Sequence, residues 1–296
     1  MITYLLFVAT LACSGISSVL GKKFQMGVKN NLPTMIMYNM INAIFGTLYF
    51  FVLCRFRIEM NMITFIFSVI YALLVINSLA MGVVSLSKVS IPFNAIIGMA
   101  GSVTGSTFFG VVLFGEAITL KQIAAMLLLI SAVAVTALTS PELRHKNNSV
   151  VVCIWNFLTA FLGSPFIKIY TVTPGVLEIN NMFFMTNFLA AALAAVYVVV
   201  FVMTRDRSLA KANFVGVTSR PAILNIASRT ALSNISSVIG AIIVAGMDLT
   251  LYNILSSSLG LVLNGCISKF IFRESLTRQN YISILLALIA IIVKTI

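Results

Sequence analysis

The stretch FGEAIT occupies residues 114–119 and recurs as FRESLT at residues 272–277, an offset of 158 residues. Each copy begins with phenylalanine, has a glutamate two positions later and ends in threonine. A long apolar run follows both copies, AAMLLLISAVAV after the first and ISILLALIAIIV after the second. Leucine, isoleucine and alanine align with any apolar segment, but the Phe-x-Glu-x-aliphatic-Thr pattern is harder to obtain by accident. We therefore predict an internal duplication.

The composition is that of an integral membrane protein. Hydrophobic residues make up 60% of the chain and charged residues 9%, with a mean hydropathy of +1.09, whereas soluble domains carry about 25% charge. The net charge of +12 comes from residues that flank apolar runs, so their expected partners are the head groups of a lipid bilayer and not nucleic acid. We expect a bacterial cytoplasmic membrane protein.

The chain divides into ten apolar runs joined by short polar segments. A helix needs roughly 20 apolar residues to cross a bilayer core. The predicted helices are residues 2–20, 33–53, 62–87, 91–113, 119–138, 149–169, 180–203, 222–246, 249–271 and 277–296. The predicted fold class is therefore an all-α membrane protein with ten transmembrane helices.

The duplication predicts two five-helix repeats, residues 1–140 and 149–296, joined by a loop at 141–148. Five is an odd number, so the second repeat enters the membrane from the opposite side. Inverted repeats of this kind are typical of transporters that work by alternating access, with the substrate site near the midplane.

These features resemble the drug/metabolite transporter superfamily, in its EamA-like branch. A Gly-Glu loop before the last helix of a repeat, ten helices in two fives and about 300 residues carry the resemblance, which covers the whole chain. Gly15 followed by Lys22, Pro33 before the second helix and Pro92 near the start of the fourth also fit the family.

Three positions depart from the family pattern. Ser14 stands where a tryptophan is usual, the second helix lacks its frequent basic residue, and the ninth helix has no proline. The resemblance implies a secondary transporter of a small-molecule substrate. It leaves open a drug or amine exporter and a flippase for lipid-linked head groups, and a channel or membrane-embedded scaffold is the alternative from another class.

One cation lies deep within a predicted helix. Arg229 follows the start of the eighth run by seven residues, which corresponds to roughly 10 Å of depth. An ionisable group in a membrane helix is a functional-site hypothesis. Arg229 either binds a substrate carboxylate or phosphate from the cavity or extends to the nearer surface and anchors the helix.

Asparagines are the other signal, because lipid cannot satisfy the hydrogen-bonding groups of an amide. Small residues and serines at helical spacing are explained as well by helix packing, and the sole tryptophan fits an interfacial anchor as well as a stacking residue. The predicted substrate-binding residues are Ser14, Asn39, Asn42, Asn77, Asn94, Trp155, Asn187, Arg229, Asn234, Asn253 and Ser257. Because no acid lies within a predicted helix, this lining favours neutral, zwitterionic or anionic solutes over cations.

The sequence predicts no enzyme, no catalytic residue, no metal site and no cofactor. All seven acids fall in or beside loops, the only histidine is His145 in a polar loop, and the four cysteines are scattered without a C-x-x-C pair. Metal and nucleophilic sites need clusters of such residues.

For Glu116 and Glu274 we predict a structural role. Each precedes a predicted helix start by about three residues, with Thr119 and Thr277 as N-caps, and a carboxylate near a helix N-terminus is favoured by the helix dipole. An ion pair that gates transport is the alternative, with Lys121 or Arg278 as the local partner.

Orientation and oligomeric state stay open. More Lys and Arg fall in loops opposite the termini than beside them, which places both termini outside by the positive-inside rule. The family resemblance implies termini in the cytoplasm. The sequence fits a monomer and a homodimer equally well.

Overall fold

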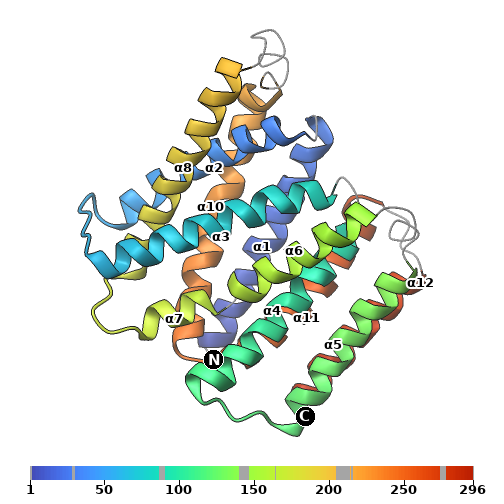
Figure 1. The fold of residues 1–296 in the computed structure, drawn as a ribbon. Coiled ribbons are helices and arrows are strands. Elements are labelled where there is room, and N and C mark those ends of the chain that lie inside the picture. The colour runs from blue at the N-terminus through green and yellow to red at the C-terminus, as the bar shows by residue number, and fades with distance from the viewer. Residues whose placement is uncertain are drawn as a thin grey trace. The chain divides into compact units, whose positions relative to one another are not determined.

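The computed structural model describes residues 2–28, 31–86, 91–139, 147–163, 165–204, 214, 216–273 and 278–295. Every regular element in these ranges is helical, which confirms the all-α prediction. The elements are α1 (Ile2–Gly27), α2 (Leu32–Leu53), α3 (Met62–Leu86), α4 (Ile91–Phe114), α5 (Leu120–Thr139), α6 (Asn147–Gly163), α7 (Phe166–Val172), α8 (Ile179–Thr204), α10 (Arg220–Ala245), α11 (Leu249–Cys266), the π-helical turn η2 (Ile267–Ile271) and α12 (Arg278–Thr295) (Figure 1).

Eight of the ten predicted runs agree with the observed helices to within two residues at either end. The first run is longer than predicted, because α1 continues past its two lysines to Gly27. Phe24 is buried in this added turn and its ring centroid lies 4.7 Å from that of Tyr38. Packing of an aromatic ring therefore extends a helix whose hydropathy has already fallen.

The predicted helix at residues 149–169 is wrong as a continuous element. It is divided into α6, which ends at Gly163, and the short α7, which begins at Phe166. Pro165 lies between them. Proline has no backbone N–H to donate and its ring clashes with the preceding turn, so it does not continue an α-helix.

The chain forms two compact units, and each takes segments from both predicted repeats. Unit 1 comprises Met1–Val83 and Ile169–Ile242, and unit 2 comprises Val84–Lys168 and Ile243–Ile296. The prediction of two contiguous five-helix repeats thus describes sequence halves and not compact bodies, and it stays a prediction.

Unit 1 is built around the pairing of α2 with α8. Its core contains a buried cluster of Phe24, Tyr38, Val217 and Ile226, contributed by α1, α2 and the region of α10. Phe50 of α2 is also buried, and its ring centroid lies 5.1 Å from that of Phe183 in α8. Buried aromatic and aliphatic side chains from different helices hold these helices together.

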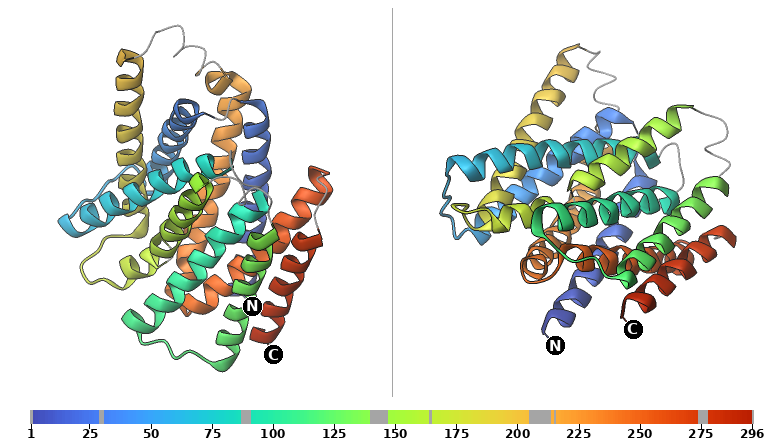
Figure 2. Two further views of the ribbon diagram at one scale, coloured as in Figure 1. Left: turned by 45° about the vertical axis from the view of Figure 1, so that its right-hand side comes forward. Right: turned by 60° about the horizontal axis from the view of Figure 1, so that its bottom comes forward.

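Unit 2 pairs α5 with α12 and packs α4 against α6 and α11 (Figure 2). Two glycines of α4 that lie one turn apart have a packing role, because a Cβ at Gly101 or Gly105 would collide with the backbone of Phe157 or Phe161 in α6. Small residues allow two helix backbones to approach closely. This favours the packing interpretation for the glycines.

Six of the described helices are long and apolar enough to cross a membrane. They are α1, α2, α4, α8, α10 and α11 with η2. Shorter apolar segments occur in α3, α5 and α12. The composition and these six helices support an integral membrane protein.

Candidate functional site

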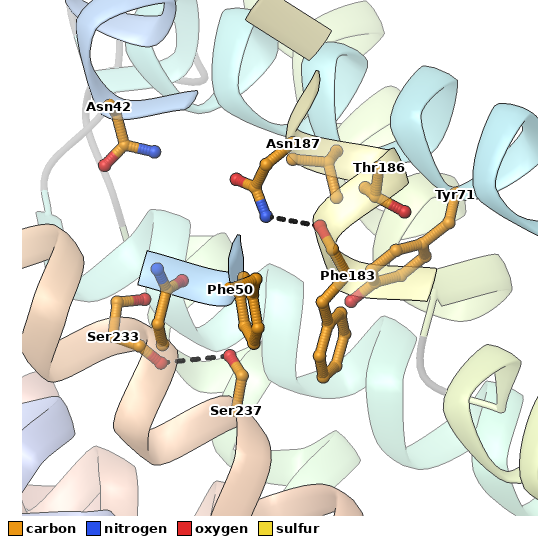
Figure 3. Close-up of a pocket in the computed structure, with 10 residues that line it drawn as sticks. Asn42, Phe50, Tyr71, Phe183, Thr186, Asn187, Ser233 and Ser237 are labelled. Atoms are coloured by element: carbon orange, nitrogen blue, oxygen red, sulfur yellow. Dashed lines mark hydrogen bonds between the residues drawn. The ribbon is translucent and has the colours of Figure 1, made fainter. Parts of the chain in front are cut away.

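A cavity of about 260 Å³ lies within unit 1, between α2, α3, α8 and α10. Its lining residues are Asn42 and Phe50 from α2, Tyr71 and Val75 from α3, Phe183, Thr186 and Asn187 from α8, and Ser233, Asn234 and Ser237 from α10 (Figure 3). None of these described residues carries a charge. The cavity therefore combines amides and hydroxyls with an aromatic wall inside a group of apolar helices.

Three cavity residues lie together on one face of α8 (Figure 3). Thr186 and Asn187 follow Phe183 by three and four residues, and side chains at these spacings are neighbours on the surface of an α-helix. The Asn187 amide donates from Nδ2 to the Phe183 carbonyl oxygen at 2.8 Å. Gly46 of α2 provides room for this amide, because a Cβ at Gly46 would overlap the Asn187 carboxamide. The glycine thus allows α2 and α8 to approach with a polar side chain between them.

Residues of α10 form the opposite polar side of the cavity. Ser237 donates to the Ser233 carbonyl oxygen at 3.0 Å, one helical turn earlier, with Asn234 beside it. The Thr230 hydroxyl donates to Asn42 Oδ1 at 2.6 Å, which links α10 to α2 and orients the Asn42 amide. These bonds hold side chains at the cavity in defined directions.

Two cavity groups have no hydrogen-bond partner among the described residues. The Thr186 hydroxyl belongs to a residue that is only 3% exposed, and the Asn234 Nδ2 atom is also buried. Leaving a buried donor or acceptor unpaired costs about 1–3 kcal/mol. Groups held at this cost next to a cavity are available to a solute that enters it.

Arg229 does not line this cavity. Its guanidinium donates to the Tyr38 hydroxyl and lies 5.4 Å from the Tyr38 ring centroid. Gly21 of α1 packs directly against the guanidinium. Within the described part of the chain these contacts favour a packing role in unit 1, and substrate binding by Arg229 stays a prediction.

The structure places the predicted site residues in several environments. Asn42, Asn187 and Asn234 line the cavity. Also in unit 1, Ser14 is exposed on α1, Asn39 is buried on α2 with an unpaired Oδ1, and Asn77 is exposed on α3 with Nδ2 bonded to the Leu73 carbonyl oxygen. In unit 2, Trp155 is 43% exposed, Ser257 is buried, and Asn253 accepts a hydrogen bond from Ser102 at 2.9 Å. The side chain of Asn94 lies outside the described residues.

The sequence predictions missed the aromatic wall and the unpaired threonine. Phe50, Tyr71 and Phe183 are indistinguishable in sequence from aromatic residues that face lipid. Thr186 directly precedes Asn187, and Ser233 directly precedes Asn234. The pairs of adjacent polar residues in apolar helices were therefore the sequence feature from which Thr186 and Ser233 could have been predicted as cavity residues.

The FGEAIT stretch forms a separate polar cluster in unit 2. Gly115 ends α4 with a positive φ of 62°, its N–H donates to the Val111 carbonyl oxygen, and the Glu116 N–H donates to that of Gly110. Left-handed glycine after a helix is a common way to end it. The turn places the Glu116 side chain at the N-terminus of α11.

The Glu116 carboxylate caps the N-terminus of α11 and pairs with a lysine. Oε1 accepts hydrogen bonds from Lys168 Nζ at 2.7 Å and from the Leu249 N–H at 2.8 Å. Oε2 accepts from the N–H and the hydroxyl of Thr250, at 3.2 Å and 2.9 Å. Asp248, the residue at the N-cap position of α11, makes no such bond. Glu116 therefore supplies the cap for a helix distant in sequence.

These contacts correct part of the prediction for the repeated stretch. Glu116 was expected to favour the N-terminus of the helix that follows it, and it instead caps α11. The alternative of an ion pair named Lys121 as the partner, and the observed partner is Lys168. The N-cap prediction for Thr119 is confirmed, because Thr119 Oγ1 accepts from the Gln122 N–H while Gln122 Oε1 accepts from the Thr119 N–H. This reciprocal arrangement is a capping box. Glu274 and Thr277 lie outside the described residues.

The surroundings of Glu116 lower its pKa from the ordinary range. Burial alone raises the pKa, but the hydrogen bonds from Lys168, Leu249 and Thr250 favour the charged form and prevail. Lys168 also donates to the Met247 carbonyl oxygen at 3.1 Å and lies 4.9 Å from the centroid of the Phe114 ring. The cluster is thus an ion pair at which both partners have further contacts.

No family model and no curated protein matches this sequence. Among solved structures, 27 chains match. One crystal structure of a protein aligns with 99% of this chain and 96% of its own, with a TM-score of 0.66 and 12% sequence identity. At this identity the likeness concerns the fold alone, and it extends over essentially the whole chain. The helical elements and the six apolar helices among the described residues give the protein the character of an integral membrane protein.

Proposed function

We propose that this protein is a secondary transporter that carries a small polar metabolite across a bacterial cytoplasmic membrane, with the cavity of unit 1 as part of its substrate site. The observation that carries the proposal is the cavity of about 260 Å³. Its polar groups are unusual inside apolar helices, because an unsatisfied polar group within a membrane costs several kcal/mol. Thr186 and Asn234 keep such groups unpaired beside the cavity.

We propose further that the chain forms ten membrane spans in two inverted repeats, and the arrangement of helices supports this. At the offset of 158 residues, α3, α4 and α5 correspond to α10, α11 with η2, and α12, with boundaries that agree within two residues. Equivalent helices also pack together, α5 with α12 and α4 with α11. Transporters built from inverted repeats bind the substrate between helices and expose it alternately to the two sides.

The resemblance to EamA-like drug/metabolite transporters points to the same class. The Gly-Glu loop that carries the resemblance ends α4 at Gly115 and Glu116. In this proposal the loop stabilises unit 2, and binding belongs to the amides and hydroxyls of unit 1.

Flux into proteoliposomes tests the proposal. Vesicles are preloaded with unlabelled uracil, nicotinamide, proline, glucose or lactate, and entry of the same labelled solute is followed. A transporter gives uptake that saturates and that is accelerated by solute on the opposite side. A flux that rises linearly with solute concentration and does not depend on solute on the opposite side would identify a channel. Uptake equal to that of protein-free vesicles for the whole panel would contradict the proposal.

Thr186→Val connects the flux to the cavity. Valine removes the unpaired hydroxyl, so we expect about tenfold weaker apparent affinity, or roughly 1.4 kcal/mol, without lower thermal stability. Thr204→Val is the matched control, because Thr204 is exposed at the end of the same helix and bonds only to its own helix. Equal effects of the two substitutions would show that transport does not depend on this cavity.

A further inference from the structure

The aromatic side of the cavity favours a flat solute. Phe50 and Phe183 lie with ring centroids 5.1 Å apart, and Tyr71 lies 6.2 Å from Phe183. All three line the cavity (Figure 3). Aromatic side chains in offset or tilted contact form an extended π surface that stabilises a further ring by about 0.5–1.5 kcal/mol beyond burial. A planar solute uses this surface better than a saturated ring of the same size.

The polar side of the cavity requires hydrogen-bonding atoms on that solute. Among the described residues, Asn234 Nδ2 is a donor without a partner, and the Thr186 hydroxyl, which can donate or accept, also has none. Asn42 contributes its Nδ2 group, since its Oδ1 atom accepts the hydrogen bond from Thr230. A carbonyl oxygen or ring nitrogen satisfies the donors, and an adjacent N–H satisfies the hydroxyl.

The absence of charge among the described lining residues selects against ionic solutes. Burying an ion without a counter-charge is far more costly than burying a neutral polar group. Arg229, the nearby cation of α10, is engaged with Tyr38 and lies outside the lining. The sequence predicted a neutral, zwitterionic or anionic solute. For this cavity we therefore infer a neutral solute.

The volume restricts the solute to about one ring. An apolar cavity of about 150 Å³ accommodates benzene, and this cavity measures about 260 Å³. The difference leaves space for a polar substituent or a second small group, but not for a disaccharide or a nucleotide.

We propose that the cavity binds an uncharged, planar solute of about one ring that carries an adjacent hydrogen-bond acceptor and donor, as in a carboxamide or a nucleobase. The assignment rests on the proposed transport function and specifies its substrate class. It follows from the tilted aromatic pair on one side, the unpaired Thr186 and Asn234 groups on the other, and the uncharged lining.

A matched series of four probes tests each element of the assignment. Benzamide is neutral and planar, benzoate has the same ring with a negative charge, benzylamine has a positive charge, and cyclohexanecarboxamide keeps the amide without planarity. Binding to the purified protein is measured by thermal shift and calorimetry. We expect benzamide to bind at least tenfold more tightly than each of the other three, because a ligand that binds the folded state raises its stability.

Asn234→Leu removes the unpaired amide with little change in volume. We expect about tenfold weaker benzamide binding, equivalent to roughly 1.4 kcal/mol. Asn77→Leu is the control, since Asn77 is exposed on α3 and bonds to its own helix. Tighter binding of benzoate, benzylamine or cyclohexanecarboxamide, or an Asn234→Leu protein that binds benzamide normally, would overturn the assignment.

The same series separates this assignment from the proposed function. Benzamide that binds through Asn234 but never exchanges across proteoliposomes would uphold the site and refute transport. Saturable exchange of a charged solute, with no benzamide binding, would uphold transport and refute the assignment. If benzamide does not bind and no solute is exchanged, both proposals are refuted.

Discussion

The cavity of unit 1 and the Glu116 cluster of unit 2 are both polar groups enclosed by apolar helices, but they differ in how completely those groups are satisfied. The two Glu116 carboxylate oxygens accept hydrogen bonds from Lys168, Leu249 and Thr250, and Lys168 also donates to the Met247 carbonyl oxygen. In the cavity, Thr186 and Asn234 leave polar atoms without a partner among the residues that the structure describes. A satisfied network stabilises a fold, whereas unpaired groups beside a space are suited to a ligand. The difference therefore separates a structural cluster from a candidate binding site.

Glu116→Ala tests whether the Glu116 cluster stabilises the fold, and it has the largest expected effect on stability. It leaves the Lys168 charge without its carboxylate and removes the cap from the N-terminus of α11. Breaking a buried pair in this way costs about 3 kcal/mol or more. We expect a clear fall in the thermal unfolding temperature in detergent.

Glu178→Ala is the control for Glu116→Ala, because Glu178 is an exposed acid of unit 1. Its substitution should change stability by less than about 0.5 kcal/mol. Equal stability of the two variants would mean that the Glu116 cluster contributes nothing and would remove the contrast with the cavity.

Acid is a milder way to disrupt the same cluster. The pKa of Glu116 is lowered in the folded protein, so its contribution to stability is complete above the unfolded value of about 4.3. That contribution is lost as the pH falls through the lower folded pKa, because the unfolded state binds the proton first. The stability difference between the wild-type protein and Glu116→Gln should shrink between pH 5 and acid of about pH 3. A constant difference would show that the carboxylate charge is not what stabilises the cluster.

Gly46→Ala perturbs the cavity and has a smaller expected effect on stability. The added methyl group displaces the Asn187 amide, and overpacking typically costs about 1–3 kcal/mol, partly offset by the higher helix propensity of alanine. Benzamide binding should weaken with it, because Asn187 forms part of the cavity wall. Gly27→Ala is the control, since a Cβ there meets nothing within 4 Å. Unchanged binding in Gly46→Ala would show that the position of Asn187 does not matter for the site.

Much of the fold was predictable from hydropathy. The boundaries of α2, α3, α4, α5, α8, α10 and α12 follow from apolar runs and flanking polar residues. Hydropathy failed at Pro165, where backbone chemistry and not polarity divides the helix. It also failed at Phe24, where contact with Tyr38 extends α1.

The candidate site was predictable in part. Asn42, Asn187 and Asn234 were found because an amide in an apolar helix needs a partner. Phe50 and Phe183 were not found, because a phenylalanine has the same sequence signature whether it faces lipid or a cavity. Arg229 shows the converse, since its depth in a helix predicted either a substrate contact or an anchor at the surface, while the contact observed is with Tyr38.

The amino-acid sequence was sufficient for the all-helical, apolar character of the protein and for most helix positions, because these depend on composition and on order along the chain. Tertiary structure decided which groups are paired. Glu116 meets Leu249 across 133 residues of sequence, and Thr186 remains unpaired beside a cavity that four helices form together. Hydrogen bonds and cavities depend on distances between separate helices, and no local pattern contains those distances.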